Sequence, residues 1–442
     1  MKVKKWFGSA LAVGLMSTSL LTACGSNNND QSSPSASAPA SGNASETPAA
    51  SSSNGKPVKL KFAMWETDTD IKFWTEKVKE YTAQKPNVTI EVETVPDNSG
   101  QYLKVRLAAN DLPDLFMMKP NHLPIYKENL LPVGDLQATA NNKYPGTLGD
   151  QVLGLPLVSF SEYVYYHPSI FQEAGVEVPK TFDEFMAAME KIKAGGKYIP
   201  LAIGGKDDWT FYPISEFGPQ VLSKDSNYLV NLATTPEPFG TGSTFDKVAN
   251  MVKTIAKDDL AGPDALAIGY DQATDLFRAK KAAMIALGQW YYADHLGKAG
   301  NDDDLAAFPL PWRATADEPL TSLTMADQYI GINKDSKNVE EAKAFYEWMF
   351  SKDVYQAYID VKLNTSTVKD VTANLPFFVK ADSEHPFTPF FVNSSDERFA
   401  KVKAAAQYDE KKTAADIFAG AKVEDVEKKL NANWKKAVES VK

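Results

Sequence analysis

The stretch VKLKFAMWETDTDIKFWTEKVKEYTAQKPNVTIEV, residues 58–92, decides the fold class. Apolar residues alternate with lysines over 58–64, which predicts a β-strand. From Ile71 to Tyr81 the apolar residues recur at helical spacing and so share one face. A second strand is predicted over 88–92. Because strand, helix and strand follow one another directly, the stretch indicates an α/β fold with mostly parallel sheets.

The same alternation continues along the rest of the chain. Further strands are predicted at 115–118, 163–166 and 282–287. Further helices are predicted around Leu103 and Leu107, from the capping box at 181–184 to the Gly195-Gly196 stop, at 338–349 and at 423–441. Trp74, Trp348 and Trp434 fall on apolar helical faces, so we expect them in the core.

The first 56 residues are predicted to export, anchor and tether the protein. Residues 1–23 combine a lysine-rich start, an apolar stretch and small residues, as in a secretory signal peptide. The sequence LTACG that ends at Gly25 resembles the lipobox of bacterial lipoproteins, which implies cleavage before Cys24 and lipidation of its thiol. An ordinary signal peptide that happens to contain a cysteine is the alternative. Residues 24–56 lack aromatic and branched aliphatic side chains, which predicts a disordered tether.

Composition excludes several classes of protein. The net charge of −10, with no basic stripe, argues against a nucleic-acid partner. The single cysteine excludes a disulfide framework, and the four histidines have no metal-ligand spacing. No phosphate-binding loop, dinucleotide fingerprint or nucleophile elbow occurs in the sequence. We therefore expect no metal, no cofactor, no catalytic residue and no enzymatic activity.

Four blocks of sequence, in order, resemble the extracellular solute-binding proteins of the maltodextrin-type, sugar-importing class. These blocks are 112–115, then 154–156 with 165–185, then 277–290, and the helix with Glu340, Ala342 and Trp348. His167, Phe182 and Lys280 depart from the usual family residues. These positions mostly shape the scaffold, so the departures leave the family resemblance intact. They do mean that the ligand of any single family member should not be assigned to this chain.

The resemblance implies a type II periplasmic-binding-protein-like clamp, in which crossing strands join two α/β lobes at a hinge. The lobes are expected at 57–160 plus 314–370 and at 161–313 plus 371–442. The protein would be the substrate-binding component of an ABC transporter. It would close on a sugar or oligosaccharide in the cleft and present it to separate permease subunits. We expect a lipid-anchored monomer on the extracellular face of the cell membrane.

The candidate ligand residues follow predicted strand ends, where clefts of α/β sheets form. Sugars need aromatic platforms for their apolar faces, and carboxylates or amides for their hydroxyl groups. Trp209 stands in a polar, glycine-rich loop and Trp290 follows a buried strand, while Trp65 could equally cap the core. The expected set is Trp65, Glu66, Asn121, Asp207, Asp208, Trp209, Trp290, Asp327 and Gln328. Glu162 and Tyr163 lie in the predicted crossing strands.

Two alternatives stay open at this point. A clamp of the same fold could bind a polyol phosphate or a cation instead of a sugar. The few arginines are scattered, which argues against a phosphate, but the Asp207-Asp208-Trp209 loop would also suit a cation. An exported glycoside hydrolase would need two carboxylates roughly 5 to 9.5 Å apart.

Overall fold

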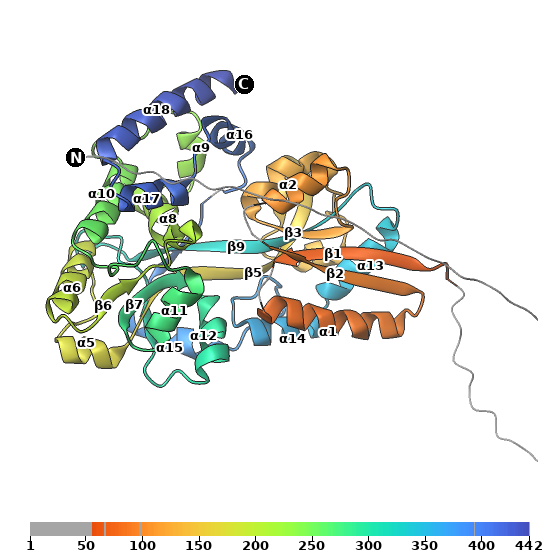
Figure 1. The fold of residues 1–442 in the computed structure, drawn as a ribbon. Helices are drawn as coiled ribbons and strands as arrows, with labels where there is room; N and C mark the ends of the chain where they lie inside the picture. The colour runs from red at the N-terminus through yellow and green to blue at the C-terminus, as the bar shows by residue number, and fades with distance from the viewer. Residues whose placement is uncertain (1–54, 66–67, 97–99, 393, 442) are drawn as a thin grey trace, which may run out of the picture. The chain divides into compact units, whose positions relative to one another are not determined.

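Strands and helices alternate along the chain in the computed structural model, which confirms the predicted α/β class (Figure 1). The structure describes residues 55–65, 68–96, 100–392 and 394–441. The predicted signal peptide, Cys24, the tether up to residue 54 and Glu66 lie outside the described residues, so these predictions are not tested by the fold.

The strands include every strand that the sequence predicts. They are β1 (Val58–Trp65), β2 (Val88–Val95), β3 (Leu115–Met118), β4 (Gly146–Leu148), β5 (Gln151–Tyr166), β6 (Ile199–Ala202), β7 (Ala282–Gly288), β8 (Ala306–Phe308), β9 (Thr321–Ile332) and β10 (Thr388–Phe390). The predicted strand at 163–166 is only the end of β5. The prediction missed the start of this strand, which the Gly149-Asp150 turn after β4 marks.

The predicted helices are present, together with further helices that the sequence did not single out. The α-helices are α1 (Asp68–Gln84), α2 (Gln101–Ala108), α3 (Leu123–Tyr126), α4 (Gln137–Asn141), α5 (Pro168–Ala174), α6 (Phe182–Ala194), α7 (Tyr212–Ser215), α8 (Phe217–Ser223), α9 (Tyr228–Leu232), α10 (Thr244–Lys257), α11 (Tyr270–Arg278), α12 (Tyr291–Ala299), α13 (Val339–Met349), α14 (Lys352–Lys362), α15 (Pro376–Glu384), α16 (Glu397–Ala406), α17 (Glu410–Phe418) and α18 (Val423–Ser440). Short 3-10 helices are η1 (Pro120–His122), η2 (Lys127–Asn129) and η3 (Asp208–Phe211). Thr181 caps α6 as predicted, since its hydroxyl accepts the Glu184 N–H at 3.2 Å.

The main sheet has the strand order β2-β1-β3-β9-β5-β7-β6. β1 pairs in parallel with β2 and β3, and β6 pairs in parallel with β7. β9 is antiparallel to β3 and to β5, and β5 is antiparallel to β7. The expectation of mostly parallel sheets was therefore wrong. The reason is that β5 and β9 do not belong to simple strand–helix–strand units, but run past each other through the centre of the sheet (Figure 1).

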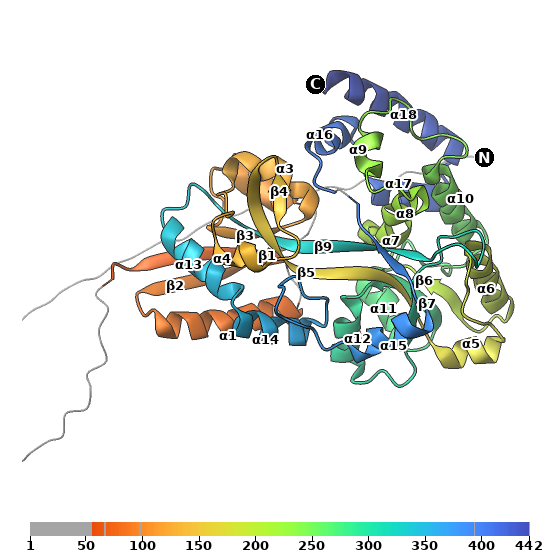
Figure 2. The same cartoon turned by 180° about the vertical axis from the view of Figure 1, so that it is seen from behind.

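Two separate hydrophobic cores lie along the crossing strands. One core contains β1 to β3 and the residues of β5 up to Phe160, together with Tyr329 and Ile330 of β9. The other contains β6, β7 and the residues of β5 from Tyr163 onward. Figure 2 shows β5 and β9 again side by side from behind, between these two groups of elements. The partly buried Trp290 and Met325 pack against both cores.

The tryptophans expected in the core are buried or packed against it. Trp74 and Trp434 are fully buried, and the half-buried Trp348 packs on the first core. β1 differs from the simple alternation, since Phe62 through Trp65 are all buried. A strand that pairs on both edges and is covered on both faces buries every side chain, whatever its polar pattern at the start. None of the described helices is long and apolar enough to cross a membrane.

Candidate functional site

The crossing strands bring chemically active side chains onto one face between the two cores. Val158 lies opposite Asp327 and Phe160 lies opposite Met325 in the regular β5–β9 register. Since alternate residues of a strand share a face and directly opposed residues point the same way, Glu162 falls in the same row. Carboxyl groups from both strands therefore border the seam between the cores.

An aromatic cluster stands beside this seam. The ring of Trp209 lies 6.1 Å from that of Trp290, 5.1 Å from that of Tyr270 and 6.3 Å from that of Tyr212, measured between centroids. Tyr270 and Trp290 are 6.0 Å apart. Trp209 and Trp290, which the sequence predicts as platforms from loops far apart in the chain, are thus brought together. Both remain half-buried, so part of each ring stays accessible.

Tyr212 fixes Trp290 to the crossing strand. Its phenolic oxygen accepts the Gly288 N–H at 2.8 Å and the Trp290 Nε1–H at 3.2 Å. The hydroxyl then donates to Oε2 of Glu162 at 3.1 Å. Gly288 must lack a side chain here, because a Cβ would lie 2.5 Å from Trp290 Nε1. The indole is therefore held at the end of β7 by both packing and hydrogen bonding.

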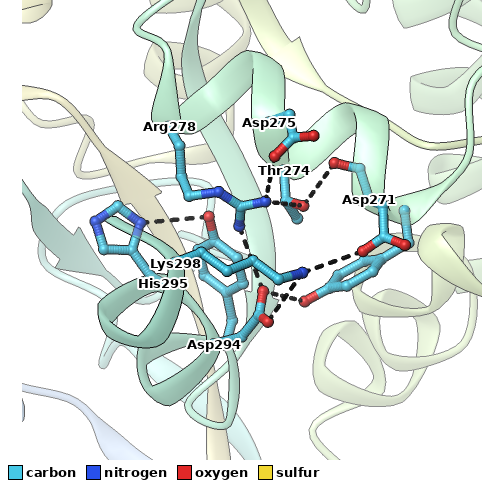
Figure 3. A network of polar contacts seen from close by, with 9 residues as sticks. Asp271, Thr274, Asp275, Arg278, Asp294, His295 and Lys298 are labelled. Atoms are coloured by element: carbon cyan, nitrogen blue, oxygen red, sulfur yellow. Dashed lines mark hydrogen bonds and ion pairs between the residues drawn. The ribbon is translucent and has the colours of Figure 1, made fainter. Parts of the chain in front are cut away.

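A charged network anchors Tyr270 at the start of α11. The Tyr270 hydroxyl donates to Oδ2 of Asp294 at 3.0 Å, and Asp294 also pairs with Arg278 and Lys298 (Figure 3). Asp207 accepts the backbone N–H of Tyr270 at 2.8 Å through Oδ2. These contacts tie the Trp209 loop to the first turn of α11 and set the spacing of the aromatic cluster.

Lys119 brings a positive charge to the site from the end of β3. Its ammonium lies 4.6 Å from the centre of the Trp65 ring and 2.6 Å from Oδ2 of Asp327. Asp327 is 3% exposed, and its Oδ1 has no hydrogen-bond partner. Trp65 is 8% exposed and belongs to the core, so it supports Lys119 and offers little free face to a ligand.

Glu162 is the least expected group of the site. It is 6% exposed, and its Oε1 has no hydrogen-bond partner. Burial raises the pKa of its carboxyl to about 8. The charge of Lys119 lowers this pKa, whereas the charges of Glu216 and Asp327 raise it. A carboxyl group with that pKa is mostly protonated at neutral pH, so it can donate a hydrogen bond.

Further charged groups that the sequence did not single out face this region. Burial pushes the pKa of Glu216 upward, but the ammonium groups of Lys411, Lys403 and Lys119 outweigh burial and lower it. Lys411 pairs with Glu216 at 3.5 Å. Burial, followed by the charges of Lys119 and other lysines, lowers the pKa of His122 to about 3, so this imidazole is neutral.

The remaining predicted residues differ in their exposure and in their hydrogen-bond partners. Asp208 is exposed on η3, and Asn121 is half-buried on η1 after β3. Gln328 points into the first core instead: its amide donates to Asp70 Oδ2 at 3.0 Å and accepts from the Tyr358 hydroxyl at 2.9 Å. The sequence missed Tyr212, Tyr270 and Glu216. The only feature of the sequence that could have indicated them is an aromatic or acidic residue at the start of a short helix.

The arrangement suits binding rather than a covalent reaction. Aromatic faces suit the apolar patches of a small molecule, and carboxyl groups suit its polar groups. Within the described ranges, no three His, Cys, Asp or Glu side chains gather closely enough to hold a metal ion. Fold and site together define an α/β protein with two hydrophobic cores and a group of aromatic and carboxyl side chains at the seam between them.

Comparison with known families identifies the class. Residues 65–356 match the family described as "Bacterial extracellular solute-binding protein". This match covers more than half of the chain, so the chain belongs to that family, whose members bind solutes and are not catalysts. The resemblance of the four sequence blocks is thereby confirmed.

Individual relatives and solved structures agree with this assignment. The chain is 25% identical over 308 residues to the multiple sugar-binding protein of Streptococcus mutans, covering 66% of this chain and 71% of the relative. A solute-binding protein solved in complex with raffinose superposes with a TM-score of 0.71 at 20% identity, covering 86% of this chain and 99% of the other. An ABC transporter binding protein of Bifidobacterium animalis subsp. lactis, solved with mannobiose, gives 0.73 at 21% identity, covering 87% and 95%.

Proposed function

We propose that the protein captures an oligosaccharide at the seam between its two cores and delivers it to the permease of an ABC transporter. The observation that carries this proposal is the cluster of Trp209, Trp290 and Tyr270 beside the buried carboxyl groups of Glu162 and Asp327. Aromatic faces stack on the C–H faces of a sugar ring, while carboxyl oxygens bind its hydroxyl groups. Neither a metal nor a cofactor is needed for such capture.

Relatives of the chain support the substrate class. One curated relative is named as a multiple sugar-binding protein, and two solved structures with the same fold hold raffinose and mannobiose. These names describe those proteins. They support an oligosaccharide for this chain because they agree with the chemistry of its own aromatic and carboxyl groups.

We propose that the two cores belong to two lobes, at 57–160 plus 314–370 and at 161–313 plus 371–442, which close around the ligand. The cores support the bound at 160, since Phe160 belongs to the first core and Tyr163 to the second. The other two bounds lie a few residues early, since Leu323 still belongs to the second core and Val371 to the first. Trp209, Trp290, Tyr270, Glu162, Asp327 and Lys119 would contact or border the ligand. Asp207 would position Tyr270, and Gln328 would brace β9.

A binding experiment tests the substrate class. Isothermal titration of the purified protein with raffinose, stachyose, mannobiose and mannotriose should give a micromolar Kd with at least one of them, which corresponds to about −8 kcal/mol. Spermidine and glycerol 3-phosphate serve as comparison solutes. Binding of one of these, with no response to any of the sugars, would retain the solute-binding protein and reject the oligosaccharide.

We further propose that Cys24 carries the lipid that anchors the protein outside the cell membrane. Two or more acyl chains anchor a protein stably, because each buried CH₂ contributes about 0.8 kcal/mol. In a Gram-positive host, Cys24→Ala should release the protein into the culture medium while its sugar affinity stays unchanged. Retention of this variant in the membrane fraction would contradict lipid anchoring at Cys24.

A further inference from the structure

The hydrogen bonds around Glu162 determine where its acidic proton can lie. The phenolic oxygen of Tyr212 already accepts hydrogen bonds from Gly288 and Trp290, so its single proton is directed at Oε2 of Glu162. Oε2 is therefore the acceptor oxygen of the carboxyl group. The carbonyl oxygen of a carboxylic acid accepts better than its hydroxyl oxygen, so a proton on Glu162 is favoured on Oε1, which is buried and has no partner among the described residues.

The surroundings favour the protonated form of this carboxyl group. Burial raises the pKa of Glu162 to about 8, which the Tyr212 hydrogen bond and Lys119 oppose and which Glu216 and Asp327 support. Tyr165 on the same strand also lies within its electrostatic reach, and burial raises the pKa of that phenol well above its ordinary value. These groups come from β5, from α7 and the residue between α7 and α8, from β9 and from the end of β3.

The charged groups that act on Glu162 are matched in ion pairs. Lys119 lies 2.6 Å from Asp327, and Lys411 lies 3.5 Å from Glu216. With Glu162 protonated, these groups leave no uncompensated charge. A charged ligand enclosed here would lose its hydration without gaining a free counter-charge, which is costly.

We propose that Glu162 acts as an uncharged hydrogen-bond donor, its Oε1–H directed at an oxygen of the bound solute, and that the site thereby selects uncharged oligosaccharides. This inference rests on the proposed function. It adds that the ligand is uncharged and that binding weakens above the pH at which Glu162 ionises. An ionised Glu162 would place an unpaired buried carboxylate against the ligand's oxygen, so binding and ionisation exclude each other.

The test is the pH dependence of sugar affinity. Titration calorimetry with raffinose, stachyose, mannobiose and mannotriose at pH 6.5, 7.5, 8.5 and 9.5 should give a constant Kd at low pH. Above pH 8 the Kd should rise by about tenfold per pH unit, because only the protonated form binds. Glu162→Gln keeps a donor that cannot ionise, so its Kd should stay within a few-fold of the parent value at pH 6.5 and remain flat to pH 9.5.

Asp382→Asn provides a matched control. Asp382 accepts a hydrogen bond from Tyr163, the neighbour of Glu162 whose side chain lies on the other face of β5, and burial raises the pKa of this carboxyl too. The control should keep the parent's rise in Kd above pH 8. If the control and Glu162→Gln both lose that rise, a general effect of removing a carboxyl group would replace the specific role of Glu162.

The outcomes separate this inference from the proposed function. A parent Kd that is flat across the range would overturn the donor role and leave the oligosaccharide-binding function standing. A flat Kd with a pH-dependent melting temperature that Glu162→Gln abolishes would assign Oε1 to a water in the small cavity that Glu162 lines with Pro213, Phe217 and Trp312. Absence of sugar binding at pH 6.5 would overturn both proposals.

Discussion

Trp290 combines contacts that usually belong to different residues. It packs against both hydrophobic cores, its ring lies beside those of Trp209 and Tyr270, and its Nε1–H is bound by Tyr212. Tyr212 also binds Glu162, so the aromatic and carboxyl parts of the site share one hydrogen-bonded unit. Such a unit keeps the ring in one orientation before the ligand arrives, which lowers the entropy cost of binding.

Truncation of this ring should therefore weaken binding strongly. Trp290→Ala removes a platform at the centre of the site, and large aromatic anchors of this kind contribute about 2 kcal/mol or more. We expect the Kd for the bound sugar to rise by about 30-fold or more, measured by titration calorimetry. Trp348→Phe, on α13 in the first core, is the control and should leave the Kd unchanged. Equal affinities for parent and Trp290→Ala would exclude this ring from the ligand site.

Two of the side chains that the sequence singled out do lie together. Trp209 stands in a polar, glycine-rich loop and Trp290 follows a buried strand, and their rings are 6.1 Å apart. Asp207 and Gln328 were expected at the ligand, yet their polar atoms bind Tyr270 and Asp70 within the fold. A sequence cannot show which polar side chain already has an internal partner. For the same reason it could not show that Glu162 lacks one.

At the scale of elements, close backbone contacts place the site loops. A Cβ on Gly204, just after β6, would lie 2.6 Å from the backbone of Gly269, which precedes α11. Only glycine allows the Trp209 loop and the start of α11 to approach this closely. The spacing between Trp209 and Tyr270 therefore depends on a residue that touches no ligand.

Gly204→Ala should consequently destabilise the protein by about 1–3 kcal/mol, because backbone cannot move aside as a side chain can. Urea unfolding followed by tryptophan fluorescence measures this change. Gly240→Ala is the matched control: a Cβ there meets no atom within 4 Å, so we expect no loss of stability. A Gly204→Ala variant as stable as the control would show that these two loops can separate at little cost.

A buried ion pair joins three other elements. Lys362 at the end of α14 lies 2.6 Å from Asp70 in the first turn of α1, with side-chain exposures of 8% and 0%. Tyr358 also donates to Asp70, and the amide of Gln328 links both to β9. Gln328 adopts a φ of 57°, a strained value for a residue with a side chain, and these hydrogen bonds hold it there.

Breaking this pair should be costly. Lys362→Met leaves the Asp70 charge buried without its counter-ion, which costs about 3–5 kcal/mol in comparable cases. The urea midpoint should fall accordingly. Lys59→Met is the control, since Lys59 pairs with Glu91 at 2.7 Å but is 64% exposed, and solvent screens such a pair. Equal midpoints for the two variants would mean that water reaches Asp70 in the folded protein.

The sequence predicted about half of the strands and fewer of the helices, but not how the strands pair. Period-2 and helical spacing gave the positions of β1, β2, β3, β7, α1, α6 and α18, because each buries one face or a short apolar run. The antiparallel passage of β5 and β9 left no local signal, since direction depends on where the chain returns from. The division of β5 between two cores is likewise a property of its neighbours and not of its own residues.

At the scale of the whole described body, contacts outside the crossing strands also link elements of the two cores. Lys127 of η2 pairs with Glu397 of α16 at 3.4 Å, and Tyr144 stacks on Phe391 at 5.9 Å. Lys127, Tyr144 and Glu397 are half-buried and Phe391 is exposed. Solvent therefore reaches both contacts, so each contributes little and can break without a large cost. Weak contacts of this kind would offer little resistance to the lobe closure proposed above.

Closure should therefore be visible as a change in distance between the lobes. Dyes on Glu76→Cys in α1 and Glu190→Cys in α6, in a Cys24→Ser background, report this distance through energy transfer. We expect transfer to rise on addition of the bound sugar, with a midpoint equal to the calorimetric Kd, because a ligand shifts the equilibrium only by its preference for the closed state. Trp290→Ala should move the midpoint to higher sugar concentration but reach the same end value. Full binding without any change in transfer would mean that the two lobes form a rigid site, and the differential affinity required for capture by closure would be absent.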